Sequence, residues 1–408
     1  MGRYLLLLVF PHPLSHDYYY NQIPLVRWTS LTAIVPFVLY CGLAIFALVN
    51  VRRKSVLSYS ILFYLITLSI VSNIVISVGT PLSERFLCLP SIGFCLALST
   101  IFVQISMRCR KSIRWGTAIL CTVLVAYSAK TIMRNPVWKD NYTLFTSDLK
   151  NSPNSVKLQA AVAGVLMDRA KGELSLSVKK ALLGEAIEHL EEALNTHPSF
   201  ANAWAMLGTA YWERDRDYEK AVSSYLKSLR FRPQHYNTYT NLGSVYNEAG
   251  EFAKAIECFQ KAVELNPQKP EGYYYLGIVN ENQKQPDLAI NNYEKAIEAD
   301  PQYLPAYKKV AFVCAAQKKE YDAALGYLRK AVDLGIADFS TYDSMGIIYG
   351  LKKDYNSAVK ALETAIRLNP KNAASYLNLA VTYQGMGDAR KAEDYFNKAY
   401  TMDPGLRK

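Results

Sequence analysis

Apolar and polar positions follow two different patterns along the 408-residue chain. Up to residue 136 the apolar residues form long runs, whereas after residue 154 they recur every three or four residues, as on one face of a helix. The runs at residues 28–51, 56–79, 86–107 and 113–133 are long enough to cross a hydrocarbon layer of about 30 Å. We therefore expect an all-α fold, with a multi-spanning helical membrane domain at residues 1–136 and an array of paired helices at residues 154–408.

Residues 137–153 are expected to link these two parts through one amphipathic helix. Trp138, Tyr142, Phe145 and Leu149 recur at spacings of three and four residues, which places them on one helical face.

A repeat of 34 or 35 residues organises the second half of the chain. One unit carries Trp204, Leu207, Gly208 and Tyr211, and later units keep the same order of large, small and aromatic residues. The units end at Pro198, Pro233, Pro267, Pro301, Pro370 and Pro404, and Gly335 occupies the remaining place. This pattern resembles the tetratricopeptide repeat (TPR), in which pairs of helices stack into a solenoid that binds other proteins.

About seven repeats are expected at residues 154–408, and the first of them is divergent. Its two helices are predicted at residues 156–170 and 186–196, with an insertion at residues 171–184 between them.

The net charge of +11 comes almost entirely from the first part of the chain. Residues 1–136 contain 12 Lys and Arg against two acidic residues, whereas the rest of the chain contains 34 against 33. The basic residues cluster at 52–54 and 108–114, in two short loops between apolar runs, and such loops mark the cytoplasmic side of a membrane. We therefore expect membrane lipid and no nucleic acid among the partners. The repeats should lie on the extracytoplasmic side: the lumen of the endoplasmic reticulum in a eukaryote, or the periplasm or exterior in a bacterium.

Two clusters in the membrane half are candidate sites. His12, His16 and Asp17 lie in a proline-bounded loop, where they could form an acid–base or metal cluster or simply an ordered turn. Glu84 and Arg85 precede an apolar run at the extracytoplasmic end, where a guanidinium could bind a lipid-linked phosphate or only pair with the neighbouring carboxylate. The spacing of His, Cys, Asp and Glu predicts no established metal-site motif.

The repeat array offers a second candidate site along the first helix of each pair. Polar and aromatic side chains on the face that points away from the second helix could bind the backbone of an extended peptide, although an ordinary solvated groove would look the same. The residues placed there are Asn202, Trp212, Asn237, Ser244, Asn247, Tyr274 and Glu281.

Three stretches of the chain resemble the transmembrane-and-TPR O-mannosyltransferase family (the TMTC proteins and their bacterial relatives). They are residues 10–24, residues 83–94, and residues 135–145 leading into the repeats. The resemblance implies a glycosyltransferase that takes its sugar from a polyprenyl or dolichyl phosphate, with TPRs that present an extracytoplasmic protein or peptide acceptor. Glu84 and Arg85 match the family's Glu-Arg pair.

The family resemblance also implies that the catalytic acid lies in the first extracytoplasmic loop, upstream of this chain. The chain is therefore expected to be a C-terminal part of such an enzyme, in which Asp17 is the remaining candidate acid besides Glu84. The alternative is a non-catalytic, membrane-anchored TPR scaffold.

Overall fold

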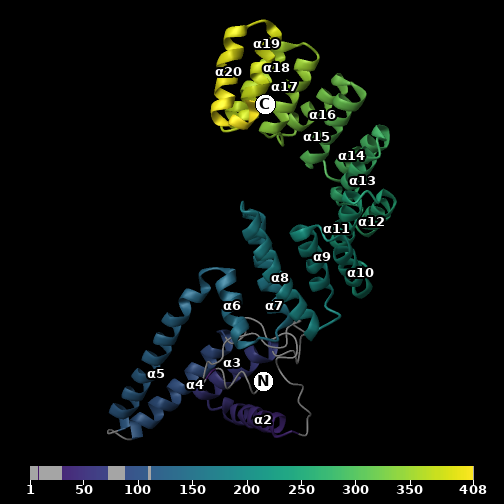
Figure 1. The fold of residues 1–408 in the computed structure, drawn as a ribbon. Helices are drawn as coiled ribbons and strands as arrows, with labels where there is room; N and C mark the ends of the chain where they lie inside the picture. Colours follow the sequence, from purple (N-terminus) through teal and green to yellow (C-terminus); the bar gives the residue numbers. More distant parts are fainter. Residues whose placement is uncertain (1–7, 9–29, 72–87, 109–111, 408) are drawn as a thin grey trace. The chain divides into compact units, whose positions relative to one another are not determined.

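The computed structural model describes residue 8 and residues 30–71, 88–108 and 112–407. Within these residues every regular element is a helix, which confirms the expected all-α fold class. The chain divides into two compact units, residues 1–231 and 232–408, and each is described by itself (Figure 1).

From residue 30 onward, the described part of the first unit begins with four apolar helices: α2 (Leu31–Val51), α3 (Val56–Val71), α4 (Cys88–Arg108) and α5 (Ser112–Arg134). Helix α2 and the segment Cys88–Ile105 are long and apolar enough to cross a membrane, with mean hydropathies of 2.4 and 1.9. Only 11% of the residues in either segment are buried, so their apolar surface is available to lipid. The described part of α3 is apolar but shorter, and α5 coincides with the fourth expected span.

Helices α2, α3 and α4 pack through close contacts between small or polar groups. The hydroxyls of Tyr40 and Tyr64 lie 2.8 Å apart, and this hydrogen bond joins α2 to α3. Gly93 of α4 lies against the backbone of α3, because a Cβ there would be 2.7 Å from the carbonyl oxygen of Ser60. Small residues allow this close approach of helices in membranes. Gly93 belongs to residues 83–94, one of the stretches that carry the family resemblance.

The expected linker helix is α6 (Asn141–Asn151), which follows the short 3₁₀ helix η2 (Asn135–Lys139). Asp140 caps α6, because its carboxylate accepts the backbone N–H of Thr143 while the Thr143 hydroxyl accepts that of Asp140. Tyr142, Phe145 and Leu149 pack against the core of the first repeat, so α6 covers its end.

Seven pairs of antiparallel helices follow, and we call the first helix of each pair A and the second B. The first unit contains α7 (Val156–Gly172), α8 (Leu176–Thr196), α9 (Ala201–Asp215) and α10 (Tyr218–Phe231). The second unit contains α11 (Tyr236–Glu248), α12 (Phe252–Leu265), α13 (Pro270–Asn282), α14 (Pro286–Ala299), α15 (Leu304–Phe312) with the π-helix η3 (Val313–Lys318), α16 (Tyr321–Asp333), α17 (Phe339–Leu351), α18 (Tyr355–Leu368), α19 (Ala373–Met386), α20 (Ala389–Met402) and the 3₁₀ helix η4 (Pro404–Arg407).

In four of the pairs a glycine in helix A packs against a large side chain in helix B, whereas α15 and α19 carry Ala311 and Ala380 at the equivalent place. A Cβ on Gly243 would lie 2.7 Å from the ring of Phe259, and one on Gly277 would lie 2.4 Å from the ring of Tyr293. The repeated glycine is therefore a steric requirement, as the sequence pattern indicated.

The turn between A and B is closed by the same backbone bond in successive repeats. In repeats 2 to 7 the N–H just before the B helix donates to a carbonyl near the end of the A helix, as in Glu251 to Tyr246 at 2.8 Å and Asp354 to Tyr349 at 2.9 Å. The prolines contribute a carbonyl acceptor, since the indole N–H of Trp204 donates to the carbonyl of Pro198 at 2.8 Å. These bonds satisfy backbone groups that a helix end leaves open.

The predicted insertion at residues 171–184 is wrong. Helix α7 continues to Gly172 and α8 begins at Leu176, so most of these residues extend the B helix of the first repeat by more than two turns. The physical reason is that Gly184, which looked like a loop residue, lies in the helix interior, with nothing nearer to its Cβ position than an Arg214 nitrogen at 3.9 Å.

The assignment of Gly335 to the proline position is also wrong. Prolines at this position stand two residues before the N-cap of the next A helix, as Pro301 does before Tyr303. Before the N-cap Asp338 this place belongs to Ile336, whereas Gly335 ends α16 with a φ of +70°. The shift arises because repeat 5 has one extra residue in its A helix, which the π-helix η3 accommodates.

Candidate functional site

The A helices of the second unit present one face away from their B helices, and we call it the A-face. Its centre is the residue directly after the glycine or alanine that stands at the packing position of each A helix. In α11, α13, α15, α17 and α19 these central residues are Ser244, Ile278, Phe312, Ile347 and Val381.

Side chains on either side of this centre connect neighbouring A helices. The Asn282 amide donates to Asn247 Oδ1 at 3.0 Å, which joins α13 to α11. The Asn378 amide donates to Asp343 Oδ2 at 3.0 Å, which joins α19 to α17. These two contacts fix polar groups of the A-face between α11 and α13 and between α17 and α19.

The predicted polar residues lie on this face at α11. Asn237 is exposed, while Ser244 is half-buried and donates its hydroxyl to the Thr240 carbonyl at 2.9 Å. The side-chain oxygen of Asn247 accepts one hydrogen bond from Asn282. A side-chain amide can form up to four hydrogen bonds. Asn237 and Asn247 therefore keep groups that a ligand backbone could use.

Tyr274 and Glu281 on α13 are tied into the packing of the repeats. The ring of Tyr274 lies 5.6 Å from that of Tyr293 and 5.5 Å from that of Tyr303, and burial raises its pKa. Glu281 accepts the Tyr293 hydroxyl at 2.7 Å and pairs with Lys309 Nζ at 3.0 Å. Both side chains shape the A-face, and the Glu281 charge is already neutralised.

Asn202 and Trp212 lie on α9, in the first unit. Asn202 is exposed, and the guanidinium of Arg216 lies 4.8 Å from the ring centroid of Trp212. They occupy the same places in their repeat as Asn237 and Asn247 do in the next.

Sequence reasoning missed the apolar part of the A-face. Phe312, Ile347 and Val381 are 52%, 44% and 55% exposed, although they are central residues of three successive A helices. The sequence could have indicated this apolar surface. The residue after the packing glycine or alanine is Ser244 in α11, but it is apolar in every later repeat.

The candidate residues of the membrane half, His12, His16, Asp17, Glu84 and Arg85, lie outside the described residues. Among the residues that are described, no three His, Cys, Asp or Glu side chains form a group that could hold a metal ion.

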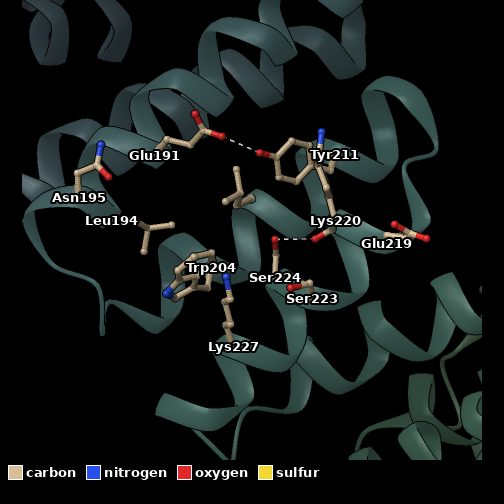
Figure 2. A pocket seen from close by; sticks show the side chains of 11 residues that line it. Glu191, Leu194, Asn195, Trp204, Tyr211, Glu219, Lys220, Ser223, Ser224 and Lys227 are labelled. Carbon is tan, nitrogen blue, oxygen red and sulfur yellow. Dashed lines mark hydrogen bonds between the residues drawn. The ribbon is translucent and has the colours of Figure 1, made fainter.

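A cavity of about 580 Å³ lies in the first unit between α8, α9 and α10 (Figure 2). The Tyr211 hydroxyl donates to Glu191 at 2.7 Å across it, and burial followed by this bond raises the Tyr211 pKa to about 12. The Lys227 ammonium covers the ring of Trp204 at 4.3 Å, and Lys220 lies 5.3 Å from that of Tyr211. Because one lysine lies over each of these two rings and the cavity carries charges of both signs, it favours no ligand class.

Comparison with known proteins agrees with the repeat structure. Three family models described as "Tetratricopeptide repeat" match residues 180–236, 270–303 and 339–404, one range each, and one described as "TPR repeat" matches residues 243–284. The solved structure titled "Crystal Structure of the Yeast Tom70" is 19% identical with a TM-score of 0.50, over 65% of this chain and 55% of that one. At this identity the likeness shows the fold alone.

Curated relatives match between half and about three fifths of the chain. "Protein O-mannosyl-transferase TMTC3" of Homo sapiens is 28% identical over 259 residues, which cover 59% of this chain and 27% of the relative. "Protein O-mannosyl-transferase TMTC1" of Homo sapiens is 32% identical over 215 residues, covering 50% and 23%. The chain thus spans about a quarter of the length of these relatives. With its apolar helices and its seven helix pairs, the chain is a TMTC-like tetratricopeptide repeat protein.

Proposed function

We propose that the chain is the C-terminal part of a membrane-embedded glycosyltransferase, in which the TPRs present a protein acceptor for O-mannosylation from a lipid-linked sugar. The observation that supports this proposal is the similarity to O-mannosyl-transferases over 59% of the chain. The A-face adds a surface of fixed amides and exposed apolar side chains, which suits a polypeptide ligand.

The membrane half would supply the donor site. A polyprenyl or dolichyl phosphate carries a negative phosphate at headgroup depth, where the guanidinium of Arg85 could bind it through two parallel hydrogen bonds. Glu84 would orient that guanidinium, and Asp17 is the candidate acid of the loop that also holds His12 and His16.

The donor and acceptor must meet on one side of the membrane, and the basic loops favour the extracytoplasmic side for the repeats. Protease added to sealed vesicles with the cytoplasmic side outward should therefore leave residues 154–404 intact until detergent is added. Digestion of the repeats without detergent would contradict this orientation.

The transferase proposal is tested by deleting the gene in its source organism and measuring O-linked mannose on extracytoplasmic proteins by mass spectrometry. We expect defined glycopeptides to lose mannose, and the full-length gene to restore it. Restoration by a full-length Arg85→Ala variant would remove the assigned donor site, and unchanged mannose after deletion would refute the transferase.

A non-catalytic scaffold is the second candidate, and the A-face supports it equally because binding needs no chemistry. Its signature would be unchanged O-mannose together with loss of specific protein assemblies after deletion.

A further inference from the structure

The turn between α2 and α3 gathers three cations at one end of these apolar helices. Arg52 follows the last residue of α2, and Arg53 and Lys54 complete the turn before α3 begins at Val56. All three side chains are exposed. We call Arg52, Arg53 and Lys54 the basic turn, and the proposed function gives it no role.

Backbone hydrogen bonds hold the basic turn closed. The N–H of Arg53 donates to the Asn50 carbonyl at 3.1 Å, and the N–H of Lys54 donates to the Val51 carbonyl at 3.0 Å. Lys54 has a φ of +50°, a left-handed conformation that is uncommon for a residue with a side chain. The turn therefore keeps three like charges on successive residues, where they repel one another.

No carboxylate of the described residues neutralises this charge. The ion pairs of the described part of the chain begin at Arg134 and involve none of the three side chains of the basic turn. The sequence between residues 18 and 83 contains no Asp or Glu. Asp17 and Glu84, the nearest acidic residues in the sequence, are each separated from the turn by an apolar run of spanning length. The countercharge is therefore left to salt or to a partner.

Exposed apolar side chains flank the basic turn on both helices. Val49, near the end of α2, is 71% exposed, and Val56, at the start of α3, is 59% exposed. Tyr59 follows one turn into α3 and is 64% exposed, and tyrosine is enriched at the headgroup level of membranes. A partner must therefore offer negative charge to the turn and hydrocarbon directly beside it. A phospholipid offers both, whereas a free phosphate offers only the charge.

The charge of the turn distinguishes between classes of phospholipid. Phosphatidylcholine carries a cationic group beside its phosphate, and three cations repel that group, whereas an anionic phospholipid has a net negative charge. A guanidinium can also bind a phosphate through two parallel hydrogen bonds. The basic loops mark the cytoplasmic side by the charge rule, and the cytoplasmic leaflet is the one that carries anionic lipids.

We propose that the basic turn binds the headgroup of an anionic phospholipid, whose acyl chains lie beside Val49 and Tyr59. This lipid is a partner that holds the α2–α3 turn at the membrane surface and is separate from the sugar donor. The inference therefore goes beyond the proposed function and does not depend on it.

The test uses the full chain in nanodiscs of phosphatidylcholine. The bilayer contains equal small amounts of two photoactivatable analogues, one of phosphatidylserine and one of phosphatidylcholine, each with its reactive group next to the headgroup. After illumination, mass spectrometry measures the lipid crosslinked to residues 48–60. We expect more crosslinking of phosphatidylserine than of phosphatidylcholine.

Variants then locate the site. One cation at an anionic membrane surface strengthens binding about fivefold, so Arg52→Gln and Arg53→Gln should each lower the ratio of the two crosslinks about fivefold. Lys130→Gln is the matched control, because Lys130 is a cation on the apolar helix α5 but lies outside the basic turn. This control should leave the ratio unchanged.

A comparison of two salts separates a lipid from a free anion. Inorganic phosphate and chloride of equal ionic strength should lower the ratio equally, because both act by screening. A larger loss in phosphate would assign the turn to a free anion and overturn the inference.

The inference is also overturned if the two lipids crosslink equally, if neither crosslinks to residues 48–60, or if Lys130→Gln lowers the ratio as much as Arg53→Gln. Unchanged O-mannose in the deletion experiment would refute the transferase and leave the lipid result as it is, so the two proposals fail separately.

Discussion

Arg134 and Asp148 form an ion pair that joins the end of α5 to α6, with Nη2 of the arginine 3.3 Å from Oδ1 of the aspartate. The Asp148 side chain is only 1% exposed, whereas that of Arg134 is 23% exposed. A carboxylate buried to this degree has lost its hydration and depends on protein donors for its charge. The pair therefore fixes the last apolar helix to the helix that covers the first repeat.

Arg134→Leu should leave the Asp148 carboxylate without this partner and cost about 1–3 kcal/mol of local stability. We expect faster hydrogen exchange in α6, measured by mass spectrometry on the full chain. The double variant Arg134→Leu with Asp148→Leu is the control, because removing both partners avoids the buried charge and should restore part of the protection. Equal exchange in the single variant and the wild type would show that the pair contributes nothing.

Gly243→Leu should force α11 and α12 apart, since even a Cβ would meet the Phe259 ring at 2.7 Å. Overpacking of this kind costs about 1–3 kcal/mol, and in a repeat protein the loss should be confined to repeat 3 and its neighbours. Hydrogen exchange can map the damage by repeat.

The matched control is Gly326→Ala in α16, where nothing lies within 4 Å of the Cβ position. That substitution should stabilise the helix by about 0.5–1 kcal/mol, because alanine has the higher helix propensity. A uniform loss of protection over all repeats in Gly243→Leu would contradict the local packing argument.

The N-terminus of α17 should lose stability in acid. Burial raises the pKa of Asp338, but hydrogen bonds from Thr341, Ser340 and Lys308 outweigh burial and lower the pKa to about 2, from an ordinary value of 3.8. A lowered pKa stabilises the folded state above the ordinary value, and this contribution is lost as the pH falls from about 3.8 towards 2.

Hydrogen-exchange protection of the first turn of α17, corrected for intrinsic rates, should therefore fall across that window. Asp338→Asn should remove the pH dependence and leave protection low throughout. The same acid-induced fall in the variant would assign the effect to another group.

Arg85→Lys tests the sequence-based prediction of a phosphate site. A guanidinium can form two parallel hydrogen bonds to a phosphate, which an ammonium cannot, so binding of a polyprenyl-phosphate sugar should weaken. If Arg85 only pairs with Glu84, lysine should replace it with little effect, because exposed pairs contribute at most about 1 kcal/mol. Lipid-phosphate binding by the purified full-length protein distinguishes the two cases.

The repeat architecture could be predicted from the sequence because the same steric constraint recurs in each unit. Gly243 and Gly277 each lie against an aromatic ring of their own B helix. The interval between them in the sequence therefore equals the length of one helix pair. The A-face positions of Asn237 and Asn247 followed from the same periodicity.

The charge state of the A-face, the start of α8 and the exposure of apolar side chains could not be predicted, because they depend on contacts between helices. Glu281 reads as an available charge, yet Lys309 on the next A helix neutralises it, and only the folded repeats bring the two together. Leu176 and Gly184 fell within the predicted insertion, but α8 includes both and tolerates the glycine in its interior. The exposure of Phe312 and Val381 was likewise invisible to a pattern that treats apolar residues as core.

The π-helix η3 limits which repeats could replace the fifth one by recombination. Repeat proteins lengthen and shorten when one unit is copied over another, and units of equal length are interchangeable in that process. Repeat 5 is not equivalent to its neighbours, because its extra residue lies inside the A helix directly after Phe312. A copy of repeat 4 in its place would remove that residue and turn the end of the A helix by about 100°. A unit that replaced the fifth would therefore need the same extra residue to keep the end of its A helix in the same orientation.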